Sequence, residues 1–435
     1  MTKKIVTTLQ EKKTRFINSW SIIYLLIVYS FTLIFEQANI IVYGIYMICA
    51  LPFFNYPDKF VCVCFVLSTM SYFFLGADEG IWSLYSILAI MLFMRMLTNK
   101  RACLSLRSFA LIVWMIFAVF LSYAQSEFGY YKGMFAMFYN IAVSVLIAMT
   151  VIFEEDTVKS FLPKIAAFQI VVYLVLLIFN GYYDGYGFSI SQKINHNTFG
   201  VSVAILSVII LIKLVYFHEK SLLYKILWVV SLALCIVIGS RNALLAAVLT
   251  SIYVYMIHQK HQGKSISGAF KFLVFACIIV IIGSLLLPEI GVDLTRFNYV
   301  ELIGSGGSNR FIIWETLSPI IWHDYRWFGY GPSHFCSEQM INSVMGLGYK
   351  HTHNTIFESW GELGFFGLIP FLLILMYALK KSYRYIKTES HYLLFGFIFI
   401  EIILLGMGES LFANIELWIV IGVLLGGIKA FNKTT

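Results

Sequence analysis

The stretch NTFGVSVAILSVIILIKLVY, residues 197–216, is apolar almost throughout and carries one charged side chain, Lys213. As an α-helix it is long enough to cross the hydrocarbon core of a bilayer, which needs about 20 apolar residues. Runs of this kind recur along the 435-residue chain, and they lack the period-2 alternation of a membrane β-barrel. The pattern predicts an all-α polytopic membrane protein.

Composition excludes a water-soluble alternative. The chain is 60% hydrophobic and 12% charged, and its mean hydropathy of +0.82 leaves too few polar side chains to cover a soluble core. No linker rich in Pro, Gly or Ser divides the chain, so we expect residues 1–435 to form a single transmembrane domain. We predict about 12–14 membrane-spanning helices, at residues 17–35, 39–53, 60–76, 80–97, 108–124, 132–153, 162–180, 197–216, 222–238, 241–257, 270–287, 355–378, 390–407 and 411–428.

Basic residues indicate the orientation of these helices. If the N-terminus is cytoplasmic, most of the 31 Lys and Arg residues fall in cytoplasmic segments, as the positive-inside rule requires. The C-terminus is then cytoplasmic too, the basic N-terminal segment leads into an uncleaved anchor, and the long loop 288–354 faces the exterior. Since the basic residues are scattered over short loops, the net charge of +8 does not indicate nucleic-acid binding. The exceptions, on the exterior side, are Lys132, Lys193, Arg241, Arg296, Arg310, Arg326 and Lys350.

The exterior loop 288–354 is too long for a simple connection and contains the polar sequence GSGGSNR, residues 304–310. Ser308 or Asn309 can cap a short helix that begins near Phe311. Tryptophans follow at residues 314, 322 and 327, as in helices that lie at a membrane interface. We therefore expect the loop to carry short helices at the outer surface.

Two arginines of the exterior side are candidates for binding phosphate groups. Arg310 follows the Gly/Ser run and opens the expected helix, so backbone amides, the helix dipole and a guanidinium converge there. Arg241 lies between two apolar helices at the outer boundary of the hydrocarbon. A flexible loop with an incidental Arg310, and an Arg241 that reaches lipid headgroups, are the alternative interpretations.

His353 is the candidate general base, because an imidazole exchanges protons near neutral pH and this one precedes a helix. His351 competes for the role, and Asn354 and Glu358 follow as possible substrate ligands. A capping or interface histidine is the alternative. No pair of histidines at helical spacing and no cysteine set suggests zinc, so we expect neither a metal nor another cofactor.

Other polar and aromatic residues of the exterior side are weaker candidates for substrate binding. His196 stands in the sequence Asn-His-Asn at the end of the loop 181–196, where the second Asn can also act as a cap. Tyr330 can stack on a sugar ring or belong to the aromatic belt. Lys193 and Arg326 complete the set of candidates as exposed basic residues.

The order of these motifs resembles the O-antigen ligase and Wzy-type polysaccharide polymerase superfamily. The resemblance covers residues 239–378 and rests on Ser240-Arg241, Asn309-Arg310-Phe311, Phe328-Gly329-Tyr330-Gly331, His353-Asn354 with Glu358, and Glu362-Leu363-Gly364. It implies a GT-C-like membrane fold and an inverting, metal-independent glycosyltransferase at the periplasmic face of the bacterial inner membrane. It also implies that Arg241 and Arg310 bind the donor pyrophosphate and that His353 acts on the acceptor.

Under this resemblance the donor is a glycan linked to undecaprenyl pyrophosphate in the lipid bilayer, and a chain-length regulator is an allowed protein partner. A polymerase transfers the glycan to the next lipid-linked repeat unit, whereas a ligase transfers it to the lipid A core. The Gly329–Pro332 motif and the Tyr-rich loop 181–196 favour a polymerase. A ligase is the first alternative, and a flippase or other transporter of lipid-linked sugars is the second.

Overall fold

A computed structural model of the chain describes residues 2–34, 40–68, 84–98, 104–183, 188–190, 195–265, 310–346 and 352–426. These residues are helical almost throughout, and their one sheet is the antiparallel pair of β1 (Tyr182–Tyr183) and β2 (Phe188–Ser189). The helices are α1 (Thr2–Ile34), α2 (Ile40–Ala50), η1 (Leu51–Asn55), α3 (Pro57–Val66), α5 (Leu84–Thr98), α6 (Leu106–Gln125), α7 (Tyr131–Thr150), η3 (Thr157–Phe161), α8 (Leu162–Asn180), α9 (His196–Val215), α10 (Leu222–Val237), α11 (Arg241–His261), α14 (Arg310–Ile320), η6 (Ile321–Tyr325), α15 (His334–Met345), α16 (Thr355–Lys387), α17 (Leu393–Gly406) and α18 (Ile415–Gly426).

Among the described residues, six helices are long and apolar enough to cross a membrane: α6, α7, η3 with α8, α9, α11 and α16. This confirms an all-α polytopic membrane protein. Five shorter apolar helices coincide with further predicted spans. The predicted span 270–287 and the end of the span 60–76 lie outside the described residues, so the total of about 12–14 spans stays a prediction.

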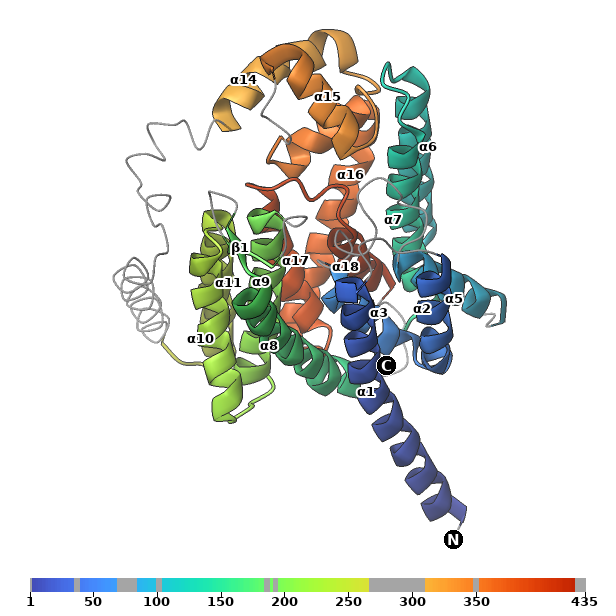
Figure 1. Cartoon of the computed structure of the whole chain (residues 1–435), viewed down its shortest axis with the longest axis vertical. Helices are drawn as coiled ribbons and strands as arrows, with labels where there is room; N and C mark the ends of the chain where they lie inside the picture. Colours follow the sequence, from blue (N-terminus) through green and yellow to red (C-terminus); the bar gives the residue numbers. More distant parts are fainter. Residues whose placement is uncertain are drawn as a thin grey trace.

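Small residues allow the helices of the core to approach closely. A Cβ atom added at Gly422 of α18 would lie 2.5 Å from the backbone oxygen of Ser144 in α7. In the same way, a Cβ at Gly200 of α9 would lie 2.4 Å from the Cβ of Ser240, just before α11. In Figure 1, α9 to α11 stand on one side, α6 and α7 on the other, and α16, α17 and α18 between them.

Helix α16 is broken at Gly364, whose φ of 61° and ψ of −168° are non-helical. The break exposes backbone groups to the loop that precedes α15: Phe365 N donates to Arg326 O (2.7 Å), and Tyr330 N donates to Gly361 O (2.9 Å). A Cβ at Gly364 would lie 2.3 Å from a carbonyl carbon of that loop. Glycine is therefore required by both the positive φ and the close approach.

The short helices expected in the loop 288–354 are present as α14, η6 and α15, which lie across one end of the molecule (Figure 1). Helix α14 begins at Arg310, one residue before the predicted start, whereas the proposed caps Ser308 and Asn309 lie outside the described residues. Helix α15 is capped by Ser333, whose side chain accepts from Cys336 N. Its apolar face packs with that of α14 in a small core of its own.

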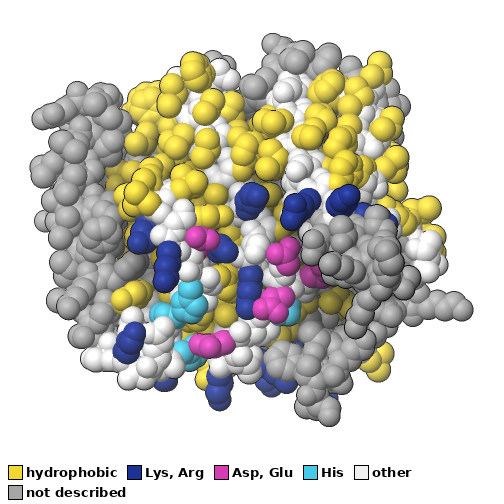
Figure 2. All heavy atoms as spheres, turned by 90° about the horizontal axis from the view of Figure 1, so that it is seen from below, with side chains coloured by type: hydrophobic (Ala, Val, Ile, Leu, Met, Phe, Trp, Pro, Cys, Tyr) yellow, Lys and Arg dark blue, Asp and Glu magenta, His cyan; other side chains and the backbone are white. Residues whose placement is uncertain are grey.

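The opposite end of the molecule, seen in Figure 2, gathers Lys, Arg, His, Asp and Glu side chains beside a hydrophobic area. The segments predicted to be cytoplasmic hold ion pairs between Lys213 and Glu219 (3.7 Å) and between His261 and Glu389 (2.7 Å). The two ends of the bundle thus differ in chemistry. One carries charged turns, and the other carries the folded segment α14–α15.

Candidate active site

The predicted base His353 lies in a tight turn at the start of α16. Its φ of 53° is in the left-handed region, which few residues other than glycine adopt and which often marks a functional site. Ser410 holds this backbone by accepting a hydrogen bond from His353 N (3.1 Å). The next residue, Asn354, caps the helix by accepting from the backbone amides of Ile356 (3.0 Å) and Phe357 (2.9 Å).

One carboxylate joins the predicted base to a predicted phosphate ligand. Glu409, in the turn between α17 and α18, lies 3.2 Å from Arg310 Nη2 through Oε1 and 3.5 Å from His353 Nδ1 through Oε2. The side chain of Glu409 is 10% exposed, against 23% for Arg310 and 25% for His353. Arg310 and His353, which are 43 positions apart in sequence, therefore meet at one buried acidic group.

The beginning of α11 reaches the same turn. Asn242 donates from Nδ2 to Leu405 O (2.8 Å). A Cβ at Gly408 would lie 2.6 Å from Asn242 Oδ1 and 2.8 Å from Arg310 Nη1. The first turn of α11, which starts with the half-buried Arg241, is thus adjacent to the guanidinium of Arg310.

Hydrogen bonds fix the Glu409 turn against its neighbours. Thr355, the first residue of α16, donates to Glu409 O (2.9 Å) and accepts from Leu411 N (2.9 Å). On the other side, Trp314 of α14 donates from its indole nitrogen to Thr352 O (2.7 Å). Helices α14, α16 and α17–α18 are consequently held together around His353.

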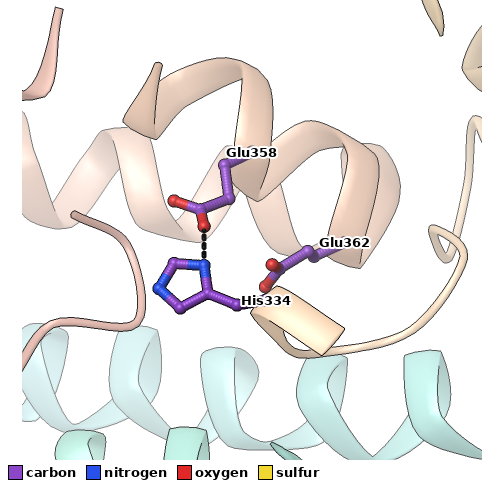
Figure 3. Close-up of side chains that lie close together, drawn as sticks. All are labelled: His334, Glu358 and Glu362. Atoms are coloured by element: carbon purple, nitrogen blue, oxygen red, sulfur yellow. Dashed lines mark ion pairs between the residues drawn. The ribbon is translucent and has the colours of Figure 1, made fainter. Parts of the chain in front are cut away.

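A second polar cluster lies under α15. His334 Nδ1 is 2.6 Å from Glu358 Oε1 (Figure 3), and Glu358 Oε2 accepts from Phe412 N (3.2 Å). One turn further along α16, Glu362 Oε1 accepts from Ser337 Oγ (2.9 Å). Burial lowers the pKa of His334, but the carboxylate of Glu358 outweighs this effect and raises it to about 9. His334 is therefore charged near neutral pH.

The remaining predicted residues do not join the group around Glu409. Tyr330 is fully buried, its ring lies against Gly361, and burial raises its pKa well above the usual value for a tyrosine. Its ring therefore has no exposed face in this structure, and its predicted contact with a sugar ring stays a prediction. Arg326 is exposed, with its guanidinium over the ring of Trp327 (5.7 Å). Glu358 is buried and faces His334, so its role as a substrate ligand stays a prediction.

Of three other candidates, the structure describes His196 alone. His196 is buried as the first residue of α9, one turn before the glycine that packs on Ser240. It is therefore near the start of α11. Lys193 and His351 lie outside the described residues, so the choice between His353 and His351 as base stays a prediction.

Two residues central to this geometry are missing from the sequence prediction. Glu409 stands in Gly-Glu-Ser, residues 408–410, between two apolar spans, where it looks like an ordinary polar turn. A carboxylate at an exterior turn next to hydrocarbon is the signal that could have found it. His334 has a weaker signal, since only its partners Glu358 and Glu362 show a pattern, the helical spacing i, i+4.

Comparison with known proteins bears on the central part of this geometry. Residues 226–372 match the model of a family described as O-antigen ligase, which confirms the resemblance inferred from the motifs. The matched range includes Arg241, Arg310 and His353 and ends before Glu409. No curated protein matches the chain. The family supports a glycosyltransferase-like enzyme of ligase or polymerase type in O-antigen assembly.

Proposed function

Because residues 226–372 match the model of a family described as O-antigen ligase, we propose that this multi-pass membrane protein is a polysaccharide polymerase. It transfers a glycan from undecaprenyl pyrophosphate to the non-reducing end of the next lipid-linked repeat unit. The family supports a ligase or a polymerase alike. The motif Gly329–Pro332 and the Tyr-rich loop 181–196 are our reasons for choosing the polymerase.

The observation that carries the proposal is the carboxylate of Glu409 between Arg310 (3.2 Å) and His353 (3.5 Å). A transferase of this kind must neutralise a departing pyrophosphate and accept a proton from a hydroxyl group within one site. A guanidinium and an imidazole on either side of one acidic group meet both needs.

The pyrophosphate of the donor is proposed to bind at the start of α11. The unpaired amides and the dipole of a helix N-terminus favour an anion, and Arg241 is the first residue of this helix. Arg310 reaches the same place, since its Nη1 lies next to Gly408 and Asn242. Two guanidinium groups can then share the charge that develops as the bond from the anomeric carbon to phosphate oxygen breaks.

The acceptor is proposed to bind on the Nε2 side of His353. Nδ1 faces Glu409 (3.5 Å), so we assign the acceptor hydroxyl group to the other ring nitrogen, Nε2. The acceptor oxygen attacks the anomeric carbon opposite the leaving group, its proton passes to His353, and undecaprenyl pyrophosphate departs. Attack from the opposite face inverts the anomeric centre. Glu409 acts as a positioning residue that holds the ring and stabilises the imidazolium.

We further propose that the site faces the periplasm of a bacterial inner membrane, with both termini in the cytoplasm. The supporting observation is that charged side chains gather at the end of the molecule opposite α14 and α15 (Figure 2). Membrane lipid then surrounds residues 1–435 as one domain, and the donor approaches from the outer leaflet. A chain-length regulator is a proposed protein partner.

Reconstitution tests the reaction directly. The purified chain in liposomes is given an undecaprenyl-pyrophosphate repeat unit as its only substrate, and the products are separated by size. A ladder of longer glycans, absent with His353→Ala, supports the polymerase. Product that forms only after lipid A core is added would show a ligase instead, and sugar that crosses the bilayer without new bonds would show a transporter.

A further inference from the structure

The cluster under α15 has no part in the proposed reaction, yet it brings three metal-binding side chains together. Glu358 and Glu362 project from successive turns of α16 toward His334 at the start of α15 (Figure 3). One ligand atom from each of the three lies within 4.8 Å of the other two. Glu358 is 1% exposed and Glu362 is fully buried.

The strongest sign of a missing ligand is one oxygen atom of Glu362. Its Oε1 accepts from Ser337 Oγ (2.9 Å). Within the described part of the chain, Oε2 is buried and has no hydrogen-bond partner. A buried carboxylate oxygen without a partner is costly, and this one belongs to the group that faces His334. A bound cation would satisfy it.

The charges of the cluster lead to the same conclusion. Two carboxylates one helical turn apart repel each other, and their burial adds a desolvation cost. One imidazolium compensates only one of them, and either a proton or a cation must compensate the other. A divalent cation bound by two carboxylates and a neutral imidazole would make the cluster electrically neutral, because it takes the place of the imidazole proton that now faces Glu358.

We propose that His334, Glu358 and Glu362 form a binding site for one first-row divalent metal ion, of the class of Zn²⁺ or Mn²⁺. One imidazole nitrogen with carboxylate oxygens suits these ions. At bond lengths of about 2.0–2.2 Å, two ligand atoms of one ion lie up to about 4.4 Å apart. The separation of 2.6 Å between His334 and Glu358 opens by roughly 1 Å on binding.

The ion would fasten the outer helices to the candidate active site. It joins α15 to α16 directly, and Glu358 continues the connection through Phe412 N (3.2 Å) into the turn that contains Glu409. The His334 side chain is 23% exposed, so an ion can enter from that side. The role is structural, since none of the three ligands contacts Arg310 or His353 in the interactions described above.

Metal analysis tests the site without relying on activity. The full-length chain, purified in detergent, is stripped with EDTA, loaded with MnCl₂ or ZnCl₂, desalted and analysed for metal. We expect about one ion per chain, a higher melting temperature after loading, and nitrogen coupling from one imidazole in pulsed EPR of the Mn²⁺ form. A wild-type chain that takes up neither ion overturns the proposal, and the two carboxylates then share a proton.

Variants locate the ion. Glu362→Gln and His334→Gln should weaken binding by more than the roughly 100-fold that loss of an outer-shell contact costs. Glu315→Gln, at an exposed position of α14, is the matched control and should retain the ion. Uptake that survives Glu362→Gln but is lost in His261→Gln would place the metal at the opposite end and refute the assignment. If the variants do not fold, the EPR spectrum of the wild type decides, because a Mn²⁺ signal without nitrogen coupling refutes the histidine ligand.

Discussion

Replacing Glu409 by glutamine removes one negative charge from the candidate active site and leaves the size of the side chain almost unchanged. The amide oxygen of the new side chain can still accept from Arg310, which lies 3.2 Å from the carboxylate. Its amide nitrogen cannot accept from His353 Nδ1, which lies 3.5 Å from the other oxygen. The imidazole therefore loses its oriented partner, whereas the arginine becomes freer to bind an anion.

The expected loss of rate follows from the free energy of a charge-assisted hydrogen bond. A hydrogen bond to a charged group contributes about 1.5–3 kcal/mol, and each 1.36 kcal/mol changes a rate by about tenfold. Because Glu409 is only 10% exposed, water does not replace the lost charge efficiently. We expect kcat for glycan elongation to fall roughly 10- to 150-fold. The donor KM should stay equal or fall, because Glu409 no longer competes for Arg310.

The assay measures initial rates of elongation in liposomes over a range of donor concentrations. Glu409→Asp keeps the charge with a shorter side chain and should lose less activity than Glu409→Gln. Glu315→Gln, on the exposed face of α14, should behave as wild type. An unchanged kcat, or a loss confined to the donor KM, would refute the assignment of Glu409 as the residue that positions His353.

Four further changes test other parts of the structure. His353→Ala should abolish elongation while the protein remains folded and inserted in the membrane; normal glycan length would exclude it as the base. Arg310→Lys keeps the charge but loses the planar fork, so donor affinity and rate should fall by roughly tenfold or more, and full activity would argue against pyrophosphate binding. Gly364→Ala should lower the melting temperature strongly, because φ is 61° and a Cβ would lie 2.3 Å from backbone; an unchanged melting temperature contradicts the break in α16. In EDTA-treated protein the pKa of His334 is about 9, above the usual value of about 6.5. Its ion pair with Glu358 therefore stabilises the folded protein fully below about pH 6.5, and this stabilisation is lost as pH rises through about 9. The melting temperature should fall across this range in the wild type, and His334→Gln should abolish this pH dependence.

The fold class was predictable because a bilayer imposes a simple length and hydrophobicity requirement. The run 197–216 coincides with α9 within one residue at each end. A helix over Arg310–Ile320 also agrees with the apolar pattern of that segment, whereas its predicted caps lie outside the described residues. The short helices α2 and α3 were harder, because Pro52 and Pro57 interrupt a region whose hydropathy alone resembles long spans.

Candidate site residues could be predicted only where the side-chain type alone indicates a chemical function. Arg310 and His353 attract attention because positive charge and imidazole are unusual beside hydrocarbon. Glu409 does not attract attention in the same way. Its proposed role depends on a tertiary contact between the turn that joins α17 to α18 and the start of α16, and no local sequence pattern encodes this contact. The motifs around Gly329 and Gly364 contribute to the family resemblance, and in the structure both glycines have positive φ and allow backbone segments to pack.

The geometry of the proposed reaction depends on helices that supply no reacting group. Glu358 connects α15 to the backbone of Phe412, and Thr355 connects α16 to Glu409 O (2.9 Å). Both connections converge on the turn between α17 and α18, whose carboxylate faces His353. A displacement of α15 would therefore move that turn and, with it, the carboxylate that faces the imidazole of His353. Since Trp314 of α14 also donates to the turn that precedes α16, the outer segment is joined to both sides of the proposed site, where His353 is the proposed base and Arg310 the proposed phosphate ligand.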